Sequence, residues 1–257
     1  MTIAITILGS GTAIPVGGRA PSALLWQSGE KTIMFDIGPG TLLRLIEQGI
    51  DYQTLSEIYL THLHSDHTLD LVTFIQANDC VFAPGRQIPL SITGCKGTHS
   101  FFAKLMEVFP GIEPVNYPLK IIERAAETWQ EGRFKVRTAL TGHTPFSLGY
   151  RVESDEGIFA YTGDAVLSDT LIDLCQDADL LICDCSYPAS IQSPDHMNTT
   201  AVGLLGASAE VKCLVPTHFY PQVLATDITA EIRRHYSGPI LPATDGMKLR
   251  IPTGGSA

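Results

Sequence analysis

The stretch THLHSDHTLD, residues 61–70, carries three histidines and an aspartate within six positions: His62, His64, Asp66 and His67. The chain has only eight histidines in 257 residues, so this concentration needs a chemical explanation. The segment before it, SEIYLT (56–61), is β-branched and aromatic enough for a buried strand, and TLDLVTFIQA (68–77) after it has helical apolar spacing. We therefore expect the stretch to be the loop between a strand and a helix.

The spacing of this motif indicates which side chains converge. An extended segment points alternate side chains to one side, whereas a helix would send positions 62, 64 and 66 to different faces. Loops at the carboxyl ends of strands are where α/β proteins place ligands. Imidazole suits zinc, iron, manganese or nickel, and added carboxylates favour a hydrolytic or oxygen-handling site over a structural zinc site, which usually uses thiolates. The motif thus predicts a metal site with His62, His64 and Asp66 converging.

Three more polar residues mark the ends of apolar, β-rich runs: His143 in LTGHTPFSLGY, Asp164 in FAYTGDA and His218 in CLVPTHFYP. Each sits beside Gly, Thr or Pro, as residues at the mouth of a strand do. One catalytic metal needs about three protein ligands, and two metals need roughly seven with a shared carboxylate. Together with the first motif, these three residues supply that number.

The order of predicted elements indicates the fold class. Strands and helices alternate up to about residue 109, residues 117–163 read almost entirely as strand and turn, and the alternation then resumes. Two mixed sheets with helices outside fit this order, which predicts an α/β protein built as a four-layer αββα sandwich. No Ser/Gly-rich linker or composition break divides the chain, so we expect a single domain over residues 1–257.

Composition and charge limit the classes of partner that the chain is expected to bind. A formal net charge of −10 offers little for polynucleotide phosphates, so long nucleic acid is not an expected partner. No apolar run approaches the roughly 20 residues that cross a bilayer, so no membrane association is expected. The start, MTIAITILGS, reads as a strand and not as a signal peptide, and the six cysteines are expected to be reduced. A cytoplasmic location follows as an expectation.

The ordered motif from His62 to His67, followed by His143, Asp164 and His218, resembles the metallo-β-lactamase superfamily, which has an αββα sandwich with one or two metals between its sheets. The resemblance implies two divalent ions, with zinc as the expected metal and manganese or iron as alternatives. It implies one ion on His62, His64 and His143, the other on Asp66, His67 and His218, and Asp164 bridging them with a water or hydroxide. Since the lactam-cleaving branch usually has cysteine at the bridging position, Asp164 favours the glyoxalase II and ribonuclease Z side.

Within the superfamily, LGSGTAIPVGGRAPSALLW (8–26) and the block HMNTTAVGLLGASAEVKCLVPTHFYP are most similar to ribonuclease Z and its smaller phosphodiesterase and arylsulfatase relatives. In that group a histidine upstream of the last ligand protonates the leaving oxygen, and His196 matches it. Ribonuclease Z also has a long arm that grips transfer RNA between the residues matching His143 and Asp164. Here that interval has room for two strands and no arm.

Two more departures weaken the likeness to ribonuclease Z. Its Pro-x-Lys-x-Arg-Asn loop is reduced to PVGGRA, which keeps Arg19 but no lysine. CDCS (183–186) stands where that family has His-Glu-Ala-Thr, so Asp184 replaces the glutamate. With the acidic charge, these losses argue against processing of transfer RNA.

The expected activity is metal-dependent hydrolysis, in which a hydroxide held by two metals attacks an ester-like centre. Asp66 would accept the nucleophile's proton and His196 would protonate the departing alkoxide. The leading substrate class is a small or cyclic nucleotide-type phosphodiester. An arylsulfatase, lactonase or thioesterase on the same site is the alternative, and a transfer-RNA 3′-processing endonuclease or a non-hydrolytic metal protein is less favoured.

Four features have open roles. Asp184 and Thr217 are candidates to orient ligand imidazoles, and Arg19 could pair with a phosphate or sulfate oxygen or simply lie on the surface. The apolar segment FFAKLMEVFPGI (101–112) is either a core helix or a dimer surface or pocket lid. Relatives often dimerise, so a homodimer is left open beside the expected small-molecule ester or phosphodiester substrate.

Overall fold

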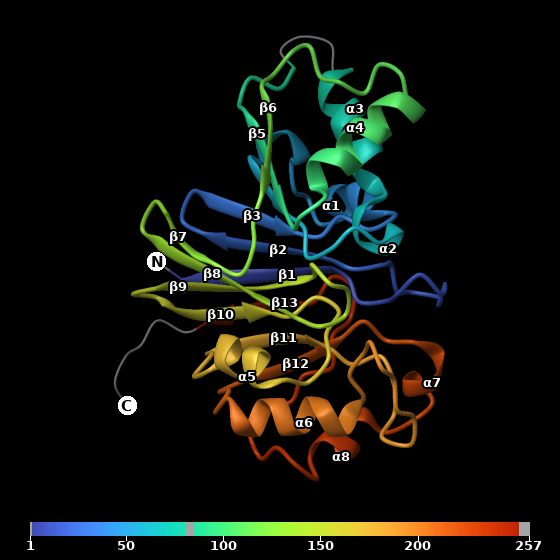
Figure 1. Ribbon diagram of the computed structural model, residues 1–257, viewed down its shortest axis with the longest axis vertical. Coiled ribbons are helices and arrows are strands. Elements are labelled where there is room, and N and C mark those ends of the chain that lie inside the picture. The colour runs from blue at the N-terminus through green and yellow to red at the C-terminus, as the bar shows by residue number, and fades with distance from the viewer. Residues whose placement is uncertain (1, 81–84, 252–257) are drawn as a thin grey trace.

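Two β-sheets face each other in the computed structural model, which describes residues 2–80 and 85–251 (Figure 1). Their strand orders are β13-β1-β2-β3-β4-β5-β6 and β12-β11-β10-β9-β8-β7. The first sheet consists of β1 (Ile3–Gly9), β2 (Ala23–Ser28), β3 (Lys31–Phe35), β4 (Glu57–Tyr59), β5 (Leu90–Gly94), β6 (Leu119–Glu123) and β13 (Lys248–Ile251). The second consists of β7 (Thr128–Glu131), β8 (Phe134–Leu140), β9 (Leu148–Ser154), β10 (Gly157–Tyr161), β11 (Leu180–Asp184) and β12 (Leu214–Thr217).

Helices cover the outer side of each sheet (Figure 1). Beside the first sheet lie α1 (Thr41–Glu47), α2 (Ser65–Thr68), α3 (Asp70–Asp79) and α4 (Thr98–Val108), with a 3₁₀ turn at Tyr52–Thr54. Beside the second lie α5 (Asp169–Cys175), α6 (Thr199–Ser208), α7 (Pro221–Leu224) and α8 (Ile228–Ile232). The predicted four-layer αββα sandwich is confirmed, whereas the single-domain organisation stays a prediction. Among the described residues, no helix is long and apolar enough to cross a bilayer.

The strands of the first sheet are apolar on both faces because both faces are covered. On β2, Leu24 and Trp26 point into the core between the sheets, while Leu25 points into the smaller core under the helices. On β3, Phe35 lies between the sheets, and its ring is within 6.0 Å of four other aromatic rings from both sheets. Alternation along each strand therefore builds two cores at once.

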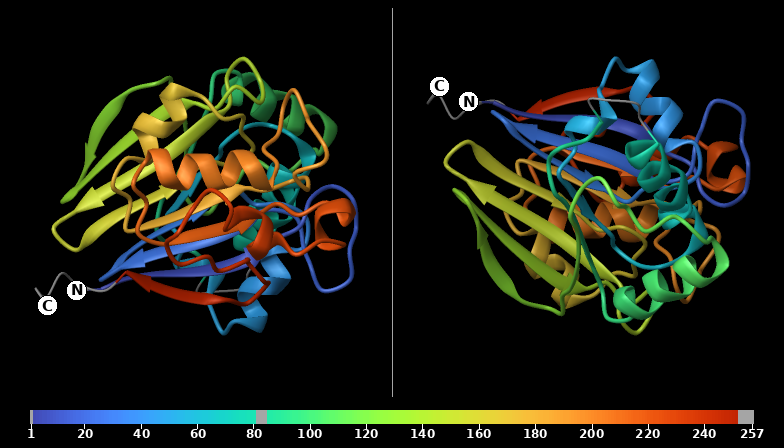
Figure 2. Two further views of the ribbon diagram at one scale, coloured as in Figure 1. Left: turned by 90° about the horizontal axis from the view of Figure 1, so that it is seen from below. Right: turned by 90° about the horizontal axis from the view of Figure 1, so that it is seen from above.

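Strand direction places the functional loops at one end of the molecule. The pairs β3·β4, β4·β5, β10·β11 and β11·β12 are parallel, and β8 runs the same way as β10 because both are antiparallel to β9. The carboxyl ends of these strands therefore open at a common edge, where α/β proteins place ligands. Helices α2 and α7 and the loop between β1 and β2 gather at that end (Figures 1 and 2).

The local structure of the opening motif corrects one expectation. His62 and His64 lie in extended loop, but residues 65–68 form the short helix α2, in which the N–H of Leu69 donates to the carbonyl of Ser65. Asp66 therefore does not continue the alternation of the two histidines. A single helical turn has no periodicity that a sequence pattern can reveal, so the prediction of an extended Asp66 was wrong.

The apolar segment 101–112 is only partly core. Phe102 of α4 is buried, but Val108 and Phe109 at the end of that helix are 68 % and 41 % exposed. The helix thus packs one face on the sheet and leaves its apolar carboxyl end open to solvent.

Candidate metal centre

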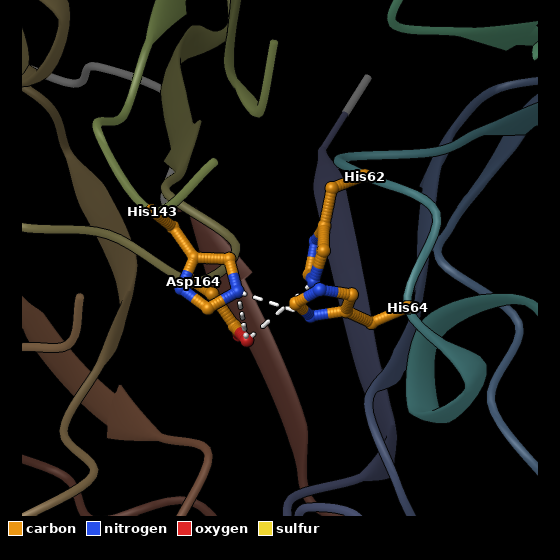
Figure 3. A group of neighbouring side chains, drawn as sticks. All are labelled: His62, His64, His143 and Asp164. Carbon is orange, nitrogen blue, oxygen red and sulfur yellow. Dashed lines mark hydrogen bonds and ion pairs between the residues drawn. The ribbon is translucent and has the colours of Figure 1, made fainter. Parts of the chain in front are cut away.

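Eight side chains meet between the carboxyl ends of the two sheets. The loop after β4 and helix α2 supply four of them, and single residues follow β8, β10, β11 and β12. Figure 3 shows His62 and His64 reaching across from one sheet toward His143 and Asp164 on the other. The full set is His62, His64, Asp66, His67, His143, Asp164, His196 and His218. The structure therefore brings together every residue predicted for the site.

Three histidines and one oxygen of Asp164 form the first group. His62 Nε2 and His143 Nε2 lie 3.6 and 3.5 Å from Asp164 Oδ2, and His143 Nε2 lies 3.1 Å from His64 Nδ1 (Figure 3). The four ligand atoms of this group lie within 4.8 Å of one another. Three imidazole nitrogens and a carboxylate oxygen at this spacing are a donor set typical of zinc and other divalent transition metals.

The other oxygen of Asp164 faces a second group. Asp164 Oδ1 lies 3.2 Å from both His67 Nε2 and His218 Nε2, and Asp66 Oδ2 lies 3.5 Å from His218 Nε2. The ligand atoms of Asp66, His67 and His218 again lie within 4.8 Å of one another. The carboxylate of Asp164 thus stands between two donor groups and turns one oxygen to each.

Buried atoms without partners show that the cluster fits a metal. Four site atoms are buried and make no hydrogen bond to any described residue: His62 Nε2, His67 Nε2, Asp164 Oδ1 and His218 Nε2. Leaving buried polar atoms unpaired costs free energy, so native proteins rarely do it without a function. All four atoms belong to the two donor groups, and divalent ions would satisfy them.

The pKa values of His62 in the first group and His218 in the second are shifted in opposite directions. Burial lowers the pKa of His62, and the neighbouring positive charge of His67 lowers it further, to well below its usual value. Burial also lowers the pKa of His218, but Asp164 and Asp184 outweigh this and raise it to about 10. Without metal, His62 is therefore neutral and ready to ligate, whereas His218 carries a proton.

Backbone geometry at the strand ends aims these side chains. His218 has φ 60, a left-handed conformation that costs a non-glycine residue on the order of 1–3 kcal/mol and clusters at functional sites. Gly163, directly before Asp164, has φ 57, and a Cβ there would lie 2.6 Å from the Thr61 side chain. Only glycine allows the two sheets to approach this closely beside the bridging carboxylate.

A carboxylate that the sequence did not single out orients two ligand histidines. Asp36, buried after β3 with φ 56, accepts hydrogen bonds from Thr61, Tyr161 and His67 Nδ1, the last at 2.8 Å. The Thr61 hydroxyl in turn lies 3.0 Å from His62 Nδ1. Both imidazoles therefore hold their protons on Nδ1 and turn Nε2 toward the centre, as metal ligands require. The only sequence signal was an aspartate between a strand and a glycine-rich turn.

The Asp36→Asn variant is expected to bind metal about 10- to 100-fold more weakly, because outer-shell partners of ligand histidines contribute that much. The amide still fills the space but no longer offers His67 a carboxylate. Isothermal titration of zinc into the metal-stripped variant measures the loss, with Asp51→Asn as a control on an exposed carboxylate that caps a 3₁₀ turn. Wild-type affinity in the Asp36 variant would show that the carboxylate does not orient the ligand.

A second buried carboxylate, Asp184, serves the other side of the site. It accepts hydrogen bonds from Ser186 Oγ at 2.6 Å and from His196 Nδ1 at 3.0 Å, and Ser186 Oγ lies 3.0 Å from His218 Nδ1. The expectation that Asp184 orients site imidazoles agrees with this geometry, and Ser186 is a further member that the sequence did not indicate. No hydrogen bond joins the Thr217 hydroxyl to a site histidine within the described part of the chain.

His196 stands beside both groups without being central to either. Its ring stacks on that of His218 at 5.3 Å and lies 4.6 Å from that of His143, whose Nδ1 bonds the carbonyl of Asp195 at 2.8 Å. Burial lowers its pKa, but the hydrogen bond and charge of Asp184 outweigh burial and raise it. His196 can therefore carry a proton near neutral pH and present it on Nε2.

Arg19 is held by the protein scaffold. Its Nη1 donates to Ser10 Oγ and to the carbonyl of Ala243, and its guanidinium lies over the ring of Phe219 at 4.8 Å. It also lines a hollow that Asp66 borders. These contacts fix the loop after β1, and an additional contact with a substrate oxygen stays a prediction.

The fold and this site define a metal-dependent hydrolase of the metallo-β-lactamase superfamily, on its ribonuclease Z-like branch. The chain is 28 % identical over 242 residues to a ribonuclease Z of Mycobacterium bovis, with 85 % of this chain and 86 % of the relative covered. It matches the family of the Anti-Pycsar protein Apyc1 over residues 3–229 and belongs to that family.

Solved structures share the architecture over nearly the whole chain. The metallo-beta-lactamase fold protein YhfI from Bacillus subtilis superposes with a TM-score of 0.86 at 24 % identity, covering 97 % of this chain and 100 % of that one. The short form of human tRNase Z gives a TM-score of 0.78 at 22 % identity, covering 97 % and 99 %. At these identities the two structures establish the fold.

Proposed function

We propose that the chain is a phosphodiesterase that uses two divalent ions, with zinc as the expected metal, to hydrolyse small or cyclic nucleotide-type phosphodiesters. The observation that carries the proposal is the carboxylate of Asp164, which turns one oxygen to each of two donor groups. His62, His64 and His143 would hold one ion, and Asp66, His67 and His218 the other. Bound there, the ions would activate a water molecule and stabilise negative charge on the attacked phosphoryl group.

Different residues around the metals would carry out the two proton transfers. His196, oriented by Asp184, would donate a proton to the leaving oxygen. Burial raises the pKa of Asp66, but the neighbouring imidazoles of His218 and His67 outweigh this and hold it below its usual value. A carboxylate with so low a pKa is a weak base, so Asp66 acts first as a ligand and only second as the acceptor of the nucleophile's proton.

The comparisons support the phosphodiester class, because ribonuclease Z relatives are named for cleaving RNA. The same names favour a second candidate, endonucleolytic processing of transfer RNA. Two features weigh against long RNA: β9 and β10 take up most of the interval between His143 and Asp164, and the net charge is −10. A chain with an acidic net charge and no arm suits a small substrate, which needs few phosphate contacts.

The test is a comparison of substrates at equal concentration on protein of known metal content. Mass spectrometry counts the ions per chain, and bis(p-nitrophenyl) phosphate, p-nitrophenyl sulfate, a lactone and a precursor transfer RNA are assayed side by side. About two ions and metal-dependent cleavage of the phosphodiester are expected. Faster turnover of the sulfate or lactone would move the assignment to a sulfatase or lactonase, and cleavage of the precursor alone would favour the endonuclease.

The His196→Ala variant is expected to lower kcat about 10²-fold toward esters with poor leaving groups, because a positioned general acid contributes at least that much. The loss should shrink for p-nitrophenyl esters, whose leaving oxygen needs little protonation. Steady-state kinetics across a series of phenyl esters measures this dependence, with His99→Ala as a control on an exposed histidine of α4. An equal loss for every leaving group would assign His196 a role other than proton donation.

A further inference from the structure

Two tyrosines stack on each other at the edge of the metal centre. Tyr187 follows β11, and Tyr220 comes directly before α7. Their ring centroids are 5.1 Å apart and their planes are 17° from parallel. No motif or spacing in the sequence indicates this pair, because its members are far apart in the chain and no metal chemistry needs them.

The pair is built on fixed backbone. The carbonyl of Tyr187 accepts from the N–H of Thr199 at 3.0 Å, which ties it to the segment that carries His196. Tyr220 follows the left-handed turn at His218, so its ring and the imidazole of His218 both lie at the metal end. Rings held by such elements are pre-organised to receive a ligand without further ordering.

The position of the pair relates it to the proposed proton donor. The rings of Tyr187 and Tyr220 lie 6.2 and 5.8 Å from that of His196, both edge to face, and Tyr220 also lies 5.8 Å from His218. Both tyrosines are partly exposed, and within residues 2–80 and 85–251 neither phenolic oxygen has a hydrogen-bond partner. The partly exposed rings therefore offer aromatic surface to a ligand beside the metal centre.

We propose that Tyr187 and Tyr220 form a binding platform for a planar aromatic ring on the leaving group of the substrate, either a nucleobase or an aryl group. The inference rests on the proposed function, since it takes His196 as the donor to the leaving oxygen. The group attached to that oxygen emerges past His196, where the two rings lie. A third ring can extend the stack, and such stacking accepts any base because every base has a π face.

The test measures binding of product-like probes to the metal-reconstituted enzyme by isothermal titration. Phenyl phosphate is compared with methyl phosphate, and adenosine 5′-monophosphate with ribose 5-phosphate. Wild type is expected to bind the ring-bearing member of at least one pair about tenfold more tightly. The Y187L/Y220L double variant should reduce this preference to near one, Y187F and Y220F should keep it, and F109L serves as a control on an exposed aromatic residue of another surface.

The methyl phosphate and ribose 5-phosphate arms report on the metal site itself. Unchanged affinity for them in the double variant shows that the fold and metals are intact, and the single leucine variants serve if the double variant does not fold. A preference for phenyl phosphate alone assigns aryl esters, and one for the nucleotide alone assigns nucleobases. Equal binding within both pairs by wild type, or a ring preference that survives in Y187L/Y220L, overturns the platform. Failure of wild type to bind any probe overturns the phosphodiesterase proposal and the platform with it.

Discussion

Replacing Asp164 with alanine is expected to lower phosphodiester turnover by at least about 10⁴-fold, the scale seen when a residue on which the whole catalytic unit depends is removed. The carboxylate faces both donor groups, so its loss takes a ligand from each. Without it, His67 and His218 also lose the carboxylate oxygen that lies 3.2 Å from each of them. Mass spectrometry should then find fewer than two ions per chain, together with the loss of turnover.

The Asp164→Asn variant separates bridging from simple ligation. An amide has one acceptor oxygen and one donor nitrogen, so it can ligate an ion in one group but not in both. We expect about one ion per chain and residual activity near that of the alanine variant. Asp155→Ala, in the exposed turn between β9 and β10, is the matched control and should keep wild-type turnover. A fully active Asp164→Ala enzyme would contradict the dinuclear assignment.

The cluster of histidine and aspartate side chains could be predicted from sequence because its members follow local sequence patterns. His62 and His64 are two apart in an extended loop, and His143, Asp164 and His218 each end an apolar run. Parallel strands end at the same edge of a sheet, so the alternation of strands and helices along the chain places these residues together. The αββα layers follow from the same alternation and from strands that are apolar on both faces.

The residues that orient the ligands could not be predicted in this way. Asp36 acts through Thr61 and His67 of the opening motif and through Tyr161, which lies about a hundred residues further along the chain. Ser186 likewise has a role only because β11 and β12 are neighbours, which sets its hydroxyl against His218. Such roles depend on long-range contacts that leave no periodicity or spacing in the sequence.

Removing the metals is expected to abolish hydrolysis and to lower the melting temperature. An ion at a free concentration of about 100 times its Kd stabilises the folded state by roughly 2.7 kcal/mol per site, since binding favours the native form. For a chain of this size that corresponds to a difference of about 5–10 °C per site. Differential scanning calorimetry of chelated and zinc-loaded protein measures it. Equal melting temperatures with full activity in the chelated sample would mean that the centre works without metal.

The pH dependence of metal binding should differ between the two donor groups. In the metal-free protein the pKa of His218 is raised to about 10, and that of His67 is also well above its usual value, because Asp164 lies between them. Both are therefore protonated at pH 7, and an ion entering this group must displace two protons. The affinity of the second group should rise about 100-fold per pH unit between pH 6 and 8. His62, whose pKa lies well below its usual value, is already neutral over this range and should add little to the pH dependence of the first group.

The same shifts give the metal-free protein the opposite trend in stability. A histidine whose pKa is raised on folding stabilises the native state fully below its unfolded pKa of about 6.5, and this contribution is lost as the pH rises through its folded pKa. The metal-free melting temperature should therefore fall between about pH 6.5 and pH 10 as His67 and His218 lose their protons.

Zinc titrations in two buffers of different ionisation heat count the protons that metal binding releases. We expect two protons for each ion that enters the second donor group. Release of none would show that these two histidines are already neutral, and that the carboxylate between them does not hold their protons.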